Sequence, residues 1–245
     1  MSNPPTQKFW VIIPAAGIGS RMQASKPKQY LKIEHSTILE HTLLCFLEHP
    51  AFEKVFVGIS KQDTYFEYLG LQKIPGVESF YGGTERSETV LNGLAHIAHL
   101  ARPDDWVWVH DAARPCLSTE EINLLIEMLN EHSSGLVLGV PISDTIKRVF
   151  HKASANELPE IKETVDRSAL WRAMTPQIFK YSDLRNALEY CRDNHLAITD
   201  EASAIEKNNM KALMVQGSEH NIKVTLPVDL HKVQQYIAQK QNPTS

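Results

Sequence analysis

Short apolar segments alternate with amphipathic segments along most of the chain, and this alternation predicts its elements. Residues 9–13 are apolar, β-branched and aromatic, which indicates a buried strand ending at Pro14. Later runs of the same character predict further strands, at 54–60, 77–81, 105–109 and 135–140. Between them apolar residues recur at helical spacing, and two helices open with the capping boxes Thr37-x-x-Glu40 and Ser118-x-x-Glu121. Strands that alternate with helices predict an α/β fold with a mostly parallel, doubly wound sheet.

The pattern changes between residues 141 and 175. Residues 145–150 and 160–165 alternate polar and apolar side chains, which predicts an antiparallel β-hairpin that projects from the sheet. An isolated hairpin is marginally stable in water, so this arm either folds back on its own chain or contacts a second subunit.

The remainder of the chain returns to helices and strands. Helices are predicted over 181–195, after Thr199 and from Pro227 onward, with strands at 212–215 and 221–225. No repeat, low-complexity tract or linker interrupts the chain outside the arm. We therefore expect one domain over residues 1–245, with the arm at 141–175 inside it.

Composition excludes several classes of protein. The chain has 245 residues, a net charge of −4 and a pI near 6.3, so its overall charge favours neither nucleic acid nor a membrane surface. Cys45, Cys116 and Cys191 lie far apart without a C-x-x-C pair, which is typical of buried thiols in a reducing compartment. Residues 1–8 do not form a signal peptide, and no apolar run approaches the length of a membrane span. We expect a soluble, cytoplasmic protein.

The loop after the first strand is the strongest chemical signal. It contains Ala15, Ala16, Gly17, Gly19 and Ser20, and small residues let backbone N–H groups approach an anion closely. The cations Arg21 and Lys28 follow, and before Glu34 the chain has five Lys or Arg residues and no acid. This composition predicts a polyphosphate site, although glycines alone also occur in ordinary turns. The loop is neither the G-x-G-x-x-G dinucleotide fingerprint nor a Walker loop.

Two more strand ends carry unusual chemistry. They are Gly82-Gly83-Thr84-Glu85-Arg86 and His110-Asp111-Ala112-Ala113-Arg114-Pro115. Ligands bind beyond the carboxyl ends of strands in such sheets, so these segments and the first loop should line one crevice. Arg21 and Lys28 suit phosphoryl transfer, which needs cations aimed at developing charge.

Other candidate residues are less decisive. We expect His110 to be a packed, hydrogen-bonded imidazole. Arg167 and Lys223, on extended segments, are each either a surface ion-pair partner or part of a second phosphate site. No histidine pair has zinc-ligand spacing, and no G-x-S-x-G nucleophile motif occurs.

An ordered set of motifs resembles a known family. The set is Pro14-Ala15-Ala16-Gly17-x-Gly19-x-Arg21-Met22, Pro27-Lys28-Gln29, Gly82-Gly83-x-Glu85-Arg86, His110-Asp111-Ala112-Ala113-Arg114-Pro115, Thr164-Val165-Asp166-Arg167, Thr175-Pro176-Gln177, Thr199-Asp200-Glu201-Ala202-Ser203 and Asn221-Ile222-Lys223-Val224-Thr225. The first motif alone marks the wider nucleotidyltransferase superfamily. Together, from about Phe9 to Ile237, they closely resemble the 2-C-methyl-D-erythritol 4-phosphate cytidylyltransferases of the non-mevalonate isoprenoid pathway.

The resemblance implies a Rossmann-like nucleotidyltransferase domain whose arm makes a homodimer. It implies a transferase that moves CMP from CTP to 2-C-methyl-D-erythritol 4-phosphate and releases pyrophosphate. Mg²⁺ would be held mainly by the CTP phosphates, without metal-ligating side chains. Arg21 and Lys28 would stabilise the transition state. Residues that would hold CTP are Pro14, Ala15, Ala16, Gly17, Gly19, Gly83, Thr84, Thr89 and Ala112. Residues that would surround the methylerythritol phosphate are Asp111, Arg114, Thr145, Arg167, Thr175, Thr199 and Lys223, some of them from the partner's arm.

The chain departs from the family pattern at two positions. Thr84 stands where Asp often follows the two glycines, and Thr89 where Ser is usual. A ribitol 5-phosphate cytidylyltransferase looks similar in the first half, but residues 165–167 and 199–203 argue against it. A non-catalytic nucleotide-binding regulator has no need of cations aimed at a transition state. A nicotinamide oxidoreductase is the poorest match, because Met22 occupies the third glycine position.

Overall fold

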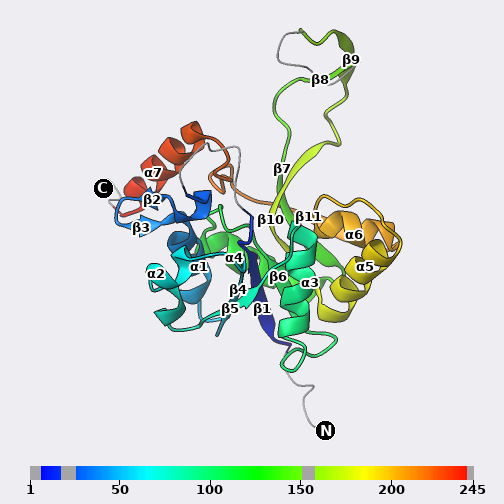
Figure 1. Ribbon diagram of the computed structural model, residues 1–245. Coiled ribbons are helices and arrows are strands. Elements are labelled where there is room, and N and C mark those ends of the chain that lie inside the picture. The colour runs from blue at the N-terminus through cyan, green and yellow to red at the C-terminus, as the bar shows by residue number, and fades with distance from the viewer. Residues whose placement is uncertain (1–6, 18–25, 151–157, 242–245) are drawn as a thin grey trace.

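The computed structural model describes residues 7–17, 26–150 and 158–241. Its centre is a seven-stranded sheet in the order β11-β7-β10-β6-β1-β4-β5 (Figure 1). The strands are β1 (Phe9–Pro14), β4 (Val55–Ile59), β5 (Val77–Tyr81), β6 (Trp106–Val109), β7 (Gly135–Pro141), β10 (Trp171–Lys180) and β11 (Ala212–Gln216). Neighbours pair in parallel except β10, which runs antiparallel to both β6 and β7. The predicted α/β fold with a mostly parallel sheet is confirmed.

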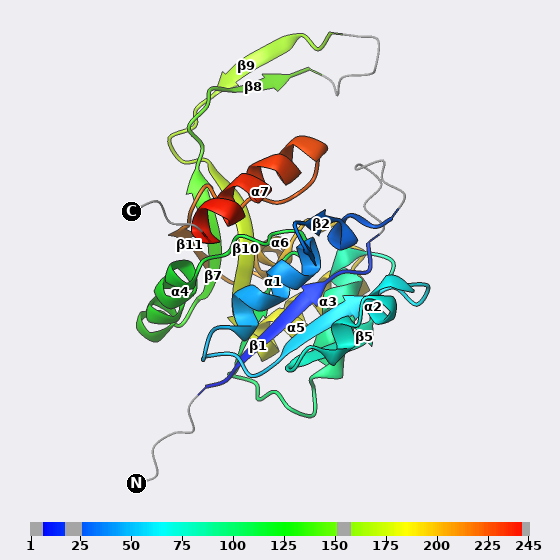
Figure 2. The same cartoon turned by 90° about the vertical axis from the view of Figure 1, so that its left-hand side faces the viewer.

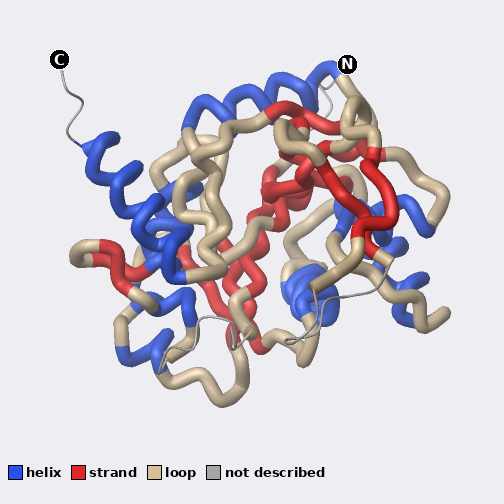
Figure 3. The backbone as a smooth tube through the Cα atoms, turned by 90° about the horizontal axis from the view of Figure 1, so that it is seen from above, coloured by secondary structure: helices blue, strands red, loops and turns tan. Residues whose placement is uncertain are grey.

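Helices cover both faces of the sheet, as expected of a doubly wound fold (Figures 1 and 3). One face packs α1 (Ile38–Leu47), α2 (Tyr65–Tyr68) and α4 (Thr119–Glu131), and the other packs α3 (Arg86–His96), α5 (Tyr181–Asp193) and α6 (Glu201–Lys207). Side chains of β1 alternate between these layers, with Val11 and Ile13 in the first core and Trp10 and Ile12 in the second. Both faces of β1 are therefore buried, which explains its continuous apolar sequence.

A smaller third core supports one side of the sheet's carboxyl edge. There α7 (Pro227–Gln241) packs its Val233 and Ile237 near the short hairpin of β2 (Lys32–Ile33) and β3 (Ser36–Thr37) (Figure 2). Two 3₁₀ turns complete the described elements, η2 (Lys28–Tyr30) and η3 (Leu71–Lys73).

The predicted capping boxes define where α1 and α4 begin. The Thr37 hydroxyl accepts the Glu40 N–H at 3.1 Å, and the Ser118 hydroxyl accepts the Glu121 N–H at 3.2 Å, with the reciprocal side-chain bonds also present. Each box satisfies backbone N–H groups that a helix start leaves without an intrahelical partner. Glu121 also accepts the backbone N–H of Ser218 at 2.8 Å, so the second box ties a distant loop to α4.

The predicted hairpin projects from the body (Figures 1 and 2). Its strands are β8 (Ile146–Val149) and β9 (Ile161–Val165), paired antiparallel. The arm leaves the end of β7, at the same edge of the sheet as the carboxyl end of β1. It is shorter than the predicted 141–175, because residues 171–175 belong to the central strand β10. Large apolar side chains on it face solvent, Phe150 at 60% exposure and Ile161 at 58%.

The structure corrects two further expectations. Strand β10 was not predicted, although most of it lies in the middle of the sheet. Residues 221–225 do not form the predicted strand, because only isolated backbone bonds hold this segment, such as that from the Val224 N–H to the Ala113 carbonyl at 2.8 Å.

All three cysteines are free, with Cys116 and Cys191 buried and Cys45 half-buried. In the part of the chain that the structure describes, no helix is both long and apolar enough to cross a bilayer.

Candidate active site

The carboxyl ends of β1, β5 and β6 meet around one pocket of about 260 Å³. The three unusual segments of the sequence therefore line one crevice, as predicted. Predicted site residues on its wall are Pro14, Ala15, Ala16, Gly17, Lys28, Gly83, Thr84, Thr89, Asp111, Ala112 and Lys223, and the wall also includes Gln29, Glu85, Arg86 and Ala113. A larger cavity of about 640 Å³ lies between α3 and the α5–α6 connection, but neither Lys28 nor Arg86 lines it. We therefore take the smaller pocket as the candidate site.

The described part of the first loop, residues 15–17, is held by hydrogen bonds on two sides. The Ala15 N–H donates to the Gly58 carbonyl at 2.8 Å, which continues the β1–β4 pairing by one bond. The buried carboxamide of Gln29 donates to the carbonyls of Ala15 and Gly17 at 2.8 and 3.2 Å. Gln29 was not predicted as a site residue, although the Pro27-Lys28-Gln29 motif marked it. The predicted residues Gly19 and Arg21 lie outside the described residues.

The segment after β5 is fixed by Thr89 of α3. The Thr89 hydroxyl accepts the Gly83 N–H and donates to the Glu85 carbonyl, both at 3.0 Å. Its γ-methyl packs against residues without side chains: a Cβ on Gly58 or Gly82 would lie only 2.4 or 2.8 Å from it. The extra methyl of Thr, compared with Ser, is therefore accommodated by these glycines, and the hydroxyl keeps its contacts.

Thr84, the other departure from the family pattern, forms its own local turn. Its backbone N–H and its hydroxyl both donate to the Glu88 carboxylate, at 2.7 and 2.9 Å. These bonds lower the pKa of Glu88, so the carboxylate stays ionised where it lines the larger cavity.

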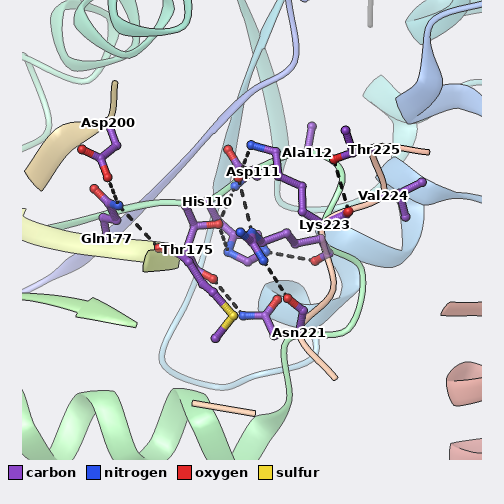
Figure 4. Close-up of polar contacts among 12 residues, drawn as sticks. His110, Asp111, Ala112, Thr175, Gln177, Asp200, Asn221, Lys223, Val224 and Thr225 are labelled. Carbon is purple, nitrogen blue, oxygen red and sulfur yellow. Dashed lines mark hydrogen bonds and ion pairs between the residues drawn. The ribbon is translucent and has the colours of Figure 1, made fainter. Parts of the chain in front are cut away.

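Asp111 lies at the centre of a cluster of cations. Its Oδ1 pairs with Nε of Arg86 at 3.1 Å, and its Oδ2 pairs with Nε of Arg114 at 3.3 Å. The same Oδ2 pairs with Nζ of Lys223 at 2.8 Å (Figure 4). Burial would raise the pKa of Asp111, but the charges of Arg86, Lys223 and Arg114 outweigh it and hold the pKa well below its usual range. Asp111 is therefore an ionised acceptor surrounded by positive charge.

A buried network of hydrogen bonds holds the backbone of Asp111 in place (Figure 4). The Thr175 hydroxyl accepts the Asp111 N–H at 3.0 Å and bonds His110 Nδ1 at 3.1 Å, while His110 Nε2 bonds the Arg114 carbonyl at 3.0 Å. Since a carbonyl only accepts, we assign the proton of His110 to Nε2. Burial lowers the pKa of His110 to about 4, so the imidazole is neutral. His110 is a packed, satisfied side chain, as predicted.

Asn221 joins this network to the segment that carries Lys223. Its Nδ2 donates to the Thr175 carbonyl at 2.9 Å, and its own carbonyl accepts from Arg114 at 2.7 Å. Asn221 is 1% exposed. The sequence marked Asn221 only as the first residue of its motif, and its buried amide was not predicted to organise the site.

Lys28 and Lys223 approach the pocket from different segments. Nζ of Lys28 donates to the Val224 carbonyl at 3.0 Å, next to Lys223 in sequence. Lys223 forms an ion pair with Asp111, which is one of the two roles that the sequence left open, and it also lines the pocket. Its other predicted role, as part of a phosphate site, stays a prediction.

Five predicted substrate residues do not line this pocket. Thr175 is buried, with its hydroxyl bonded to the Asp111 N–H. Arg114 is nearly buried and borders an adjoining cavity of about 410 Å³ that also reaches Lys223. Thr199 is exposed just before α6. Thr145 and Arg167 are exposed on or beside the arm, and neither lines the pocket or the adjoining cavity.

Arg86 and Glu201 were not predicted as a pair. The Arg86 guanidinium bonds Glu201 Oε1 at 2.6 Å as well as Asp111. Glu201 is 1% exposed, and burial raises its pKa while the charge of Arg86 opposes that rise. The sequence placed Glu201 only in the first turn of a helix and gave no sign that it reaches a residue so far back in the chain.

This combination defines a class of protein. A doubly wound sheet carries, at its carboxyl edge, a loop of small residues, several cations and an ionised acceptor, which are the parts that nucleotidyl transfer requires. Comparison with known proteins specifies the family. Residues 9–239 match the family described as 2-C-methyl-D-erythritol 4-phosphate cytidylyltransferase, and the chain belongs to it. It is therefore a cytidylyltransferase, and the resemblance inferred from the motifs is confirmed.

Individual relatives agree over nearly full length. The chain is 44% identical to the 2-C-methyl-D-erythritol 4-phosphate cytidylyltransferase of Vibrio vulnificus strain YJ016, over 94% of this chain and 95% of that protein. It is 45% identical to that of Colwellia psychrerythraea, over 98% and 99%. A crystal structure of 4-diphosphocytidyl-2C-methyl-D-erythritol synthase superposes with a TM-score of 0.79 at 39% identity, covering 95% of this chain and all of that one. These matches do not favour the ribitol 5-phosphate alternative.

Proposed function

We propose that the pocket transfers CMP from CTP to 2-C-methyl-D-erythritol 4-phosphate by direct in-line attack. A phosphate oxygen of the acceptor forms a bond to the α-phosphorus of CTP, the bond from that phosphorus to the bridging oxygen breaks, and pyrophosphate leaves. The observation that carries this proposal is the convergence of the first loop, Lys28 and the Asp111–Lys223 pair on one pocket. Phosphoryl transfer makes little covalent demand on a protein, so positioning and positive charge are the chemistry to supply.

On the nucleotide side, backbone N–H groups of residues 14–17 would contact the triphosphate. Gly83, Thr84, Thr89 and Ala112 would hold the cytidine. Lys28, together with Arg21 outside the described residues, would stabilise the charge that grows on the phosphoryl oxygens and on the leaving pyrophosphate. The hydrogen bond of Lys28 to the Val224 carbonyl supports this role, because it holds the ammonium group at the pocket wall.

On the acceptor side, Asp111, Arg114, Thr175 and Lys223 form one bonded cluster, and Lys223 would turn toward the attacking phosphate. Thr199 precedes α6, whose Glu201 pairs with Arg86 beside this cluster. Thr145 and Arg167 would complete the acceptor site if the arm of a second chain reached over the pocket. The arm leaves the same edge of the sheet that carries the pocket and exposes apolar side chains, which supports a homodimer joined through it.

Mg²⁺ would accompany CTP into this site. Within the described residues, no group of three His, Cys, Asp or Glu side chains is arranged to hold a metal. Asp111 already faces three cations, so the wall suits a metal held chiefly by the triphosphate. When bound, Mg²⁺ neutralises charge on the phosphates. A cytoplasmic location would supply CTP and keep the free thiols reduced.

The test is pyrophosphate release with CTP and Mg²⁺, comparing methylerythritol 4-phosphate with ribitol 5-phosphate as acceptor. Release with the first acceptor alone is expected. Release with ribitol 5-phosphate would keep the fold and the Lys28 chemistry but overturn the assigned substrate. CTP binding without release in either mixture would favour a regulator.

A further inference from the structure

Arg86 is the residue through which the nucleotide side of the pocket touches the acceptor side. It is the first residue of α3 and directly follows the Gly83–Glu85 segment that we assign to cytidine. Its guanidinium nevertheless points to two carboxylates elsewhere, with Nε at 3.1 Å from Asp111 Oδ1 and an Nη atom at 2.6 Å from Glu201 Oε1. Two N–H groups of one rigid, planar guanidinium therefore bond two carboxylates from different parts of the chain, Asp111 after β6 and Glu201 in α6.

The two oxygens of Asp111 have different partners, and this difference matters for binding. Oδ1 contacts Arg86, whereas Oδ2 contacts Lys223 at 2.8 Å and Arg114 at 3.3 Å. If Lys223 turns to the acceptor phosphate, Oδ2 loses its nearest cation and can accept a hydrogen bond from a hydroxyl of the polyol. Oδ1 stays bound to Arg86, so the carboxylate keeps its orientation during this exchange.

Glu201 fixes Arg86 from the opposite side. It is almost wholly buried, and it sits in the first turn of α6. The N-cap of α6, Asp200, accepts from Gln177 of β10 at 2.9 Å (Figure 4). Gln177 also accepts the Ala202 N–H at 2.9 Å, so the start of α6 is bonded to the sheet. Glu201 therefore holds Arg86 on a rigid support and balances part of the positive charge around Asp111.

We propose that Arg86, supported by Glu201, is a positioning residue for the polyol of the acceptor and acts through Asp111. This inference rests on the function proposed above. It assigns Arg86 no contact with the triphosphate, because Nε and Nη1 of its guanidinium already donate to the carboxylates of Asp111 and Glu201. Its effect should therefore fall on the acceptor and leave the nucleotide nearly unchanged.

The test uses Arg86→Lys and Glu201→Gln in the full chain, with Arg102→Lys as the matched control. Arg102 also pairs with a buried aspartate, Asp105, but at the amino end of β6, away from the pocket. A lysine keeps the charge but cannot bridge two carboxylates with fixed geometry. We expect Arg86→Lys to raise the KM for methylerythritol 4-phosphate roughly 10-fold with the KM for CTP changed by less than about 2-fold. Glu201→Gln should give a smaller rise, about 3-fold, with the same selectivity.

Several results would overturn the inference. A rise in the KM for CTP as large as that for the acceptor would make Arg86 a nucleotide ligand. Unchanged KM values for both substrates, with only a lower Tm, would make the pair structural, and Arg102→Lys shows what such a variant looks like. If Arg86→Lys does not fold, Glu201→Gln carries the same comparison. Wild-type protein that releases no pyrophosphate with either acceptor would refute the proposed function itself, a result distinct from any of these.

Discussion

Replacing Lys28 by alanine tests the proposed chemistry at a residue that the structure describes. Lys28 reaches the pocket wall with its Nζ bonded to the Val224 carbonyl at 3.0 Å. Two unit charges 4 Å apart interact by about 4 kcal/mol at an effective dielectric constant of 20. If about half to three quarters of a charge develops on the leaving group, the lost stabilisation is about 2–3 kcal/mol, or roughly 30- to 150-fold in kcat.

The assay is steady-state pyrophosphate release, with kcat and both KM values measured for each variant. Lys32→Ala is the matched control, because Lys32 lies nearby on β2 with an exposed side chain outside the pocket. We expect it to leave kcat within about 2-fold of wild type, since exposed charges are strongly screened by salt. A Lys28→Ala enzyme with unchanged kcat and a raised KM for CTP would refute the reasoning, because Lys28 would then only hold the bound nucleotide.

Two further predictions concern stability and assembly. Asp105 is 1% exposed, and its carboxylate accepts hydrogen bonds from the backbone of Lys8, the indole of Trp10 and both the backbone and the side chain of Arg102. Asp105→Asn should therefore lower the free energy of unfolding by about 3 kcal/mol, which corresponds to a Tm lower by roughly 6–12 °C in thermal unfolding. Burial would raise the pKa of Asp105, but the hydrogen bonds from Arg102, Lys8 and Trp10 outweigh it and hold that pKa below its usual range. The contribution of Asp105 to stability is therefore full above the ordinary pKa of an aspartate and is lost as pH falls through the depressed pKa, and an equal acid dependence in Asp105→Asn would contradict this. For the arm, Ile161→Asp should convert a dimer to a monomer in light scattering after size-exclusion chromatography, and a wild-type monomer would remove the dimer proposal.

Much of the fold was predictable because its signals are local. The capping boxes at Thr37 and Ser118 and the buried strand at 9–13 each arise within a few residues, where spacing alone determines the outcome. The crevice was also predictable, because carboxyl ends of parallel strands meet at one edge of a sheet.

The sequence pattern did not predict strand β10, because some of its residues belong both to the sheet and to the hydrogen-bond network of the site. Thr175 and Gln177 are polar and flank Pro176, which reads as a break in a strand. In the structure both side chains are buried and satisfied by the site network, Thr175 by His110 and the Asp111 backbone and Gln177 by Asp200. Polar residues can fill a central strand only when such partners exist, and local sequence does not reveal them.

The Arg86–Glu201 pair marks the limit of sequence reasoning about the site. Each residue lay in a motif, but acidic residues after an N-cap are ordinary in a first helical turn. Their contact joins positions 115 residues apart. It depends on how α3 and α6 pack on the same face of the sheet, which the spacing of either motif cannot show.

The most direct measurement of the central claim is pyrophosphate release from CTP and Mg²⁺ before and after the acceptor is added. Direct attack by the acceptor phosphate predicts no release while acceptor is absent. It then predicts one pyrophosphate for each 4-diphosphocytidyl-2-C-methyl-D-erythritol formed once methylerythritol 4-phosphate is present. A burst of pyrophosphate equal to the enzyme concentration before the acceptor is added would reveal a CMP–enzyme intermediate and contradict the account.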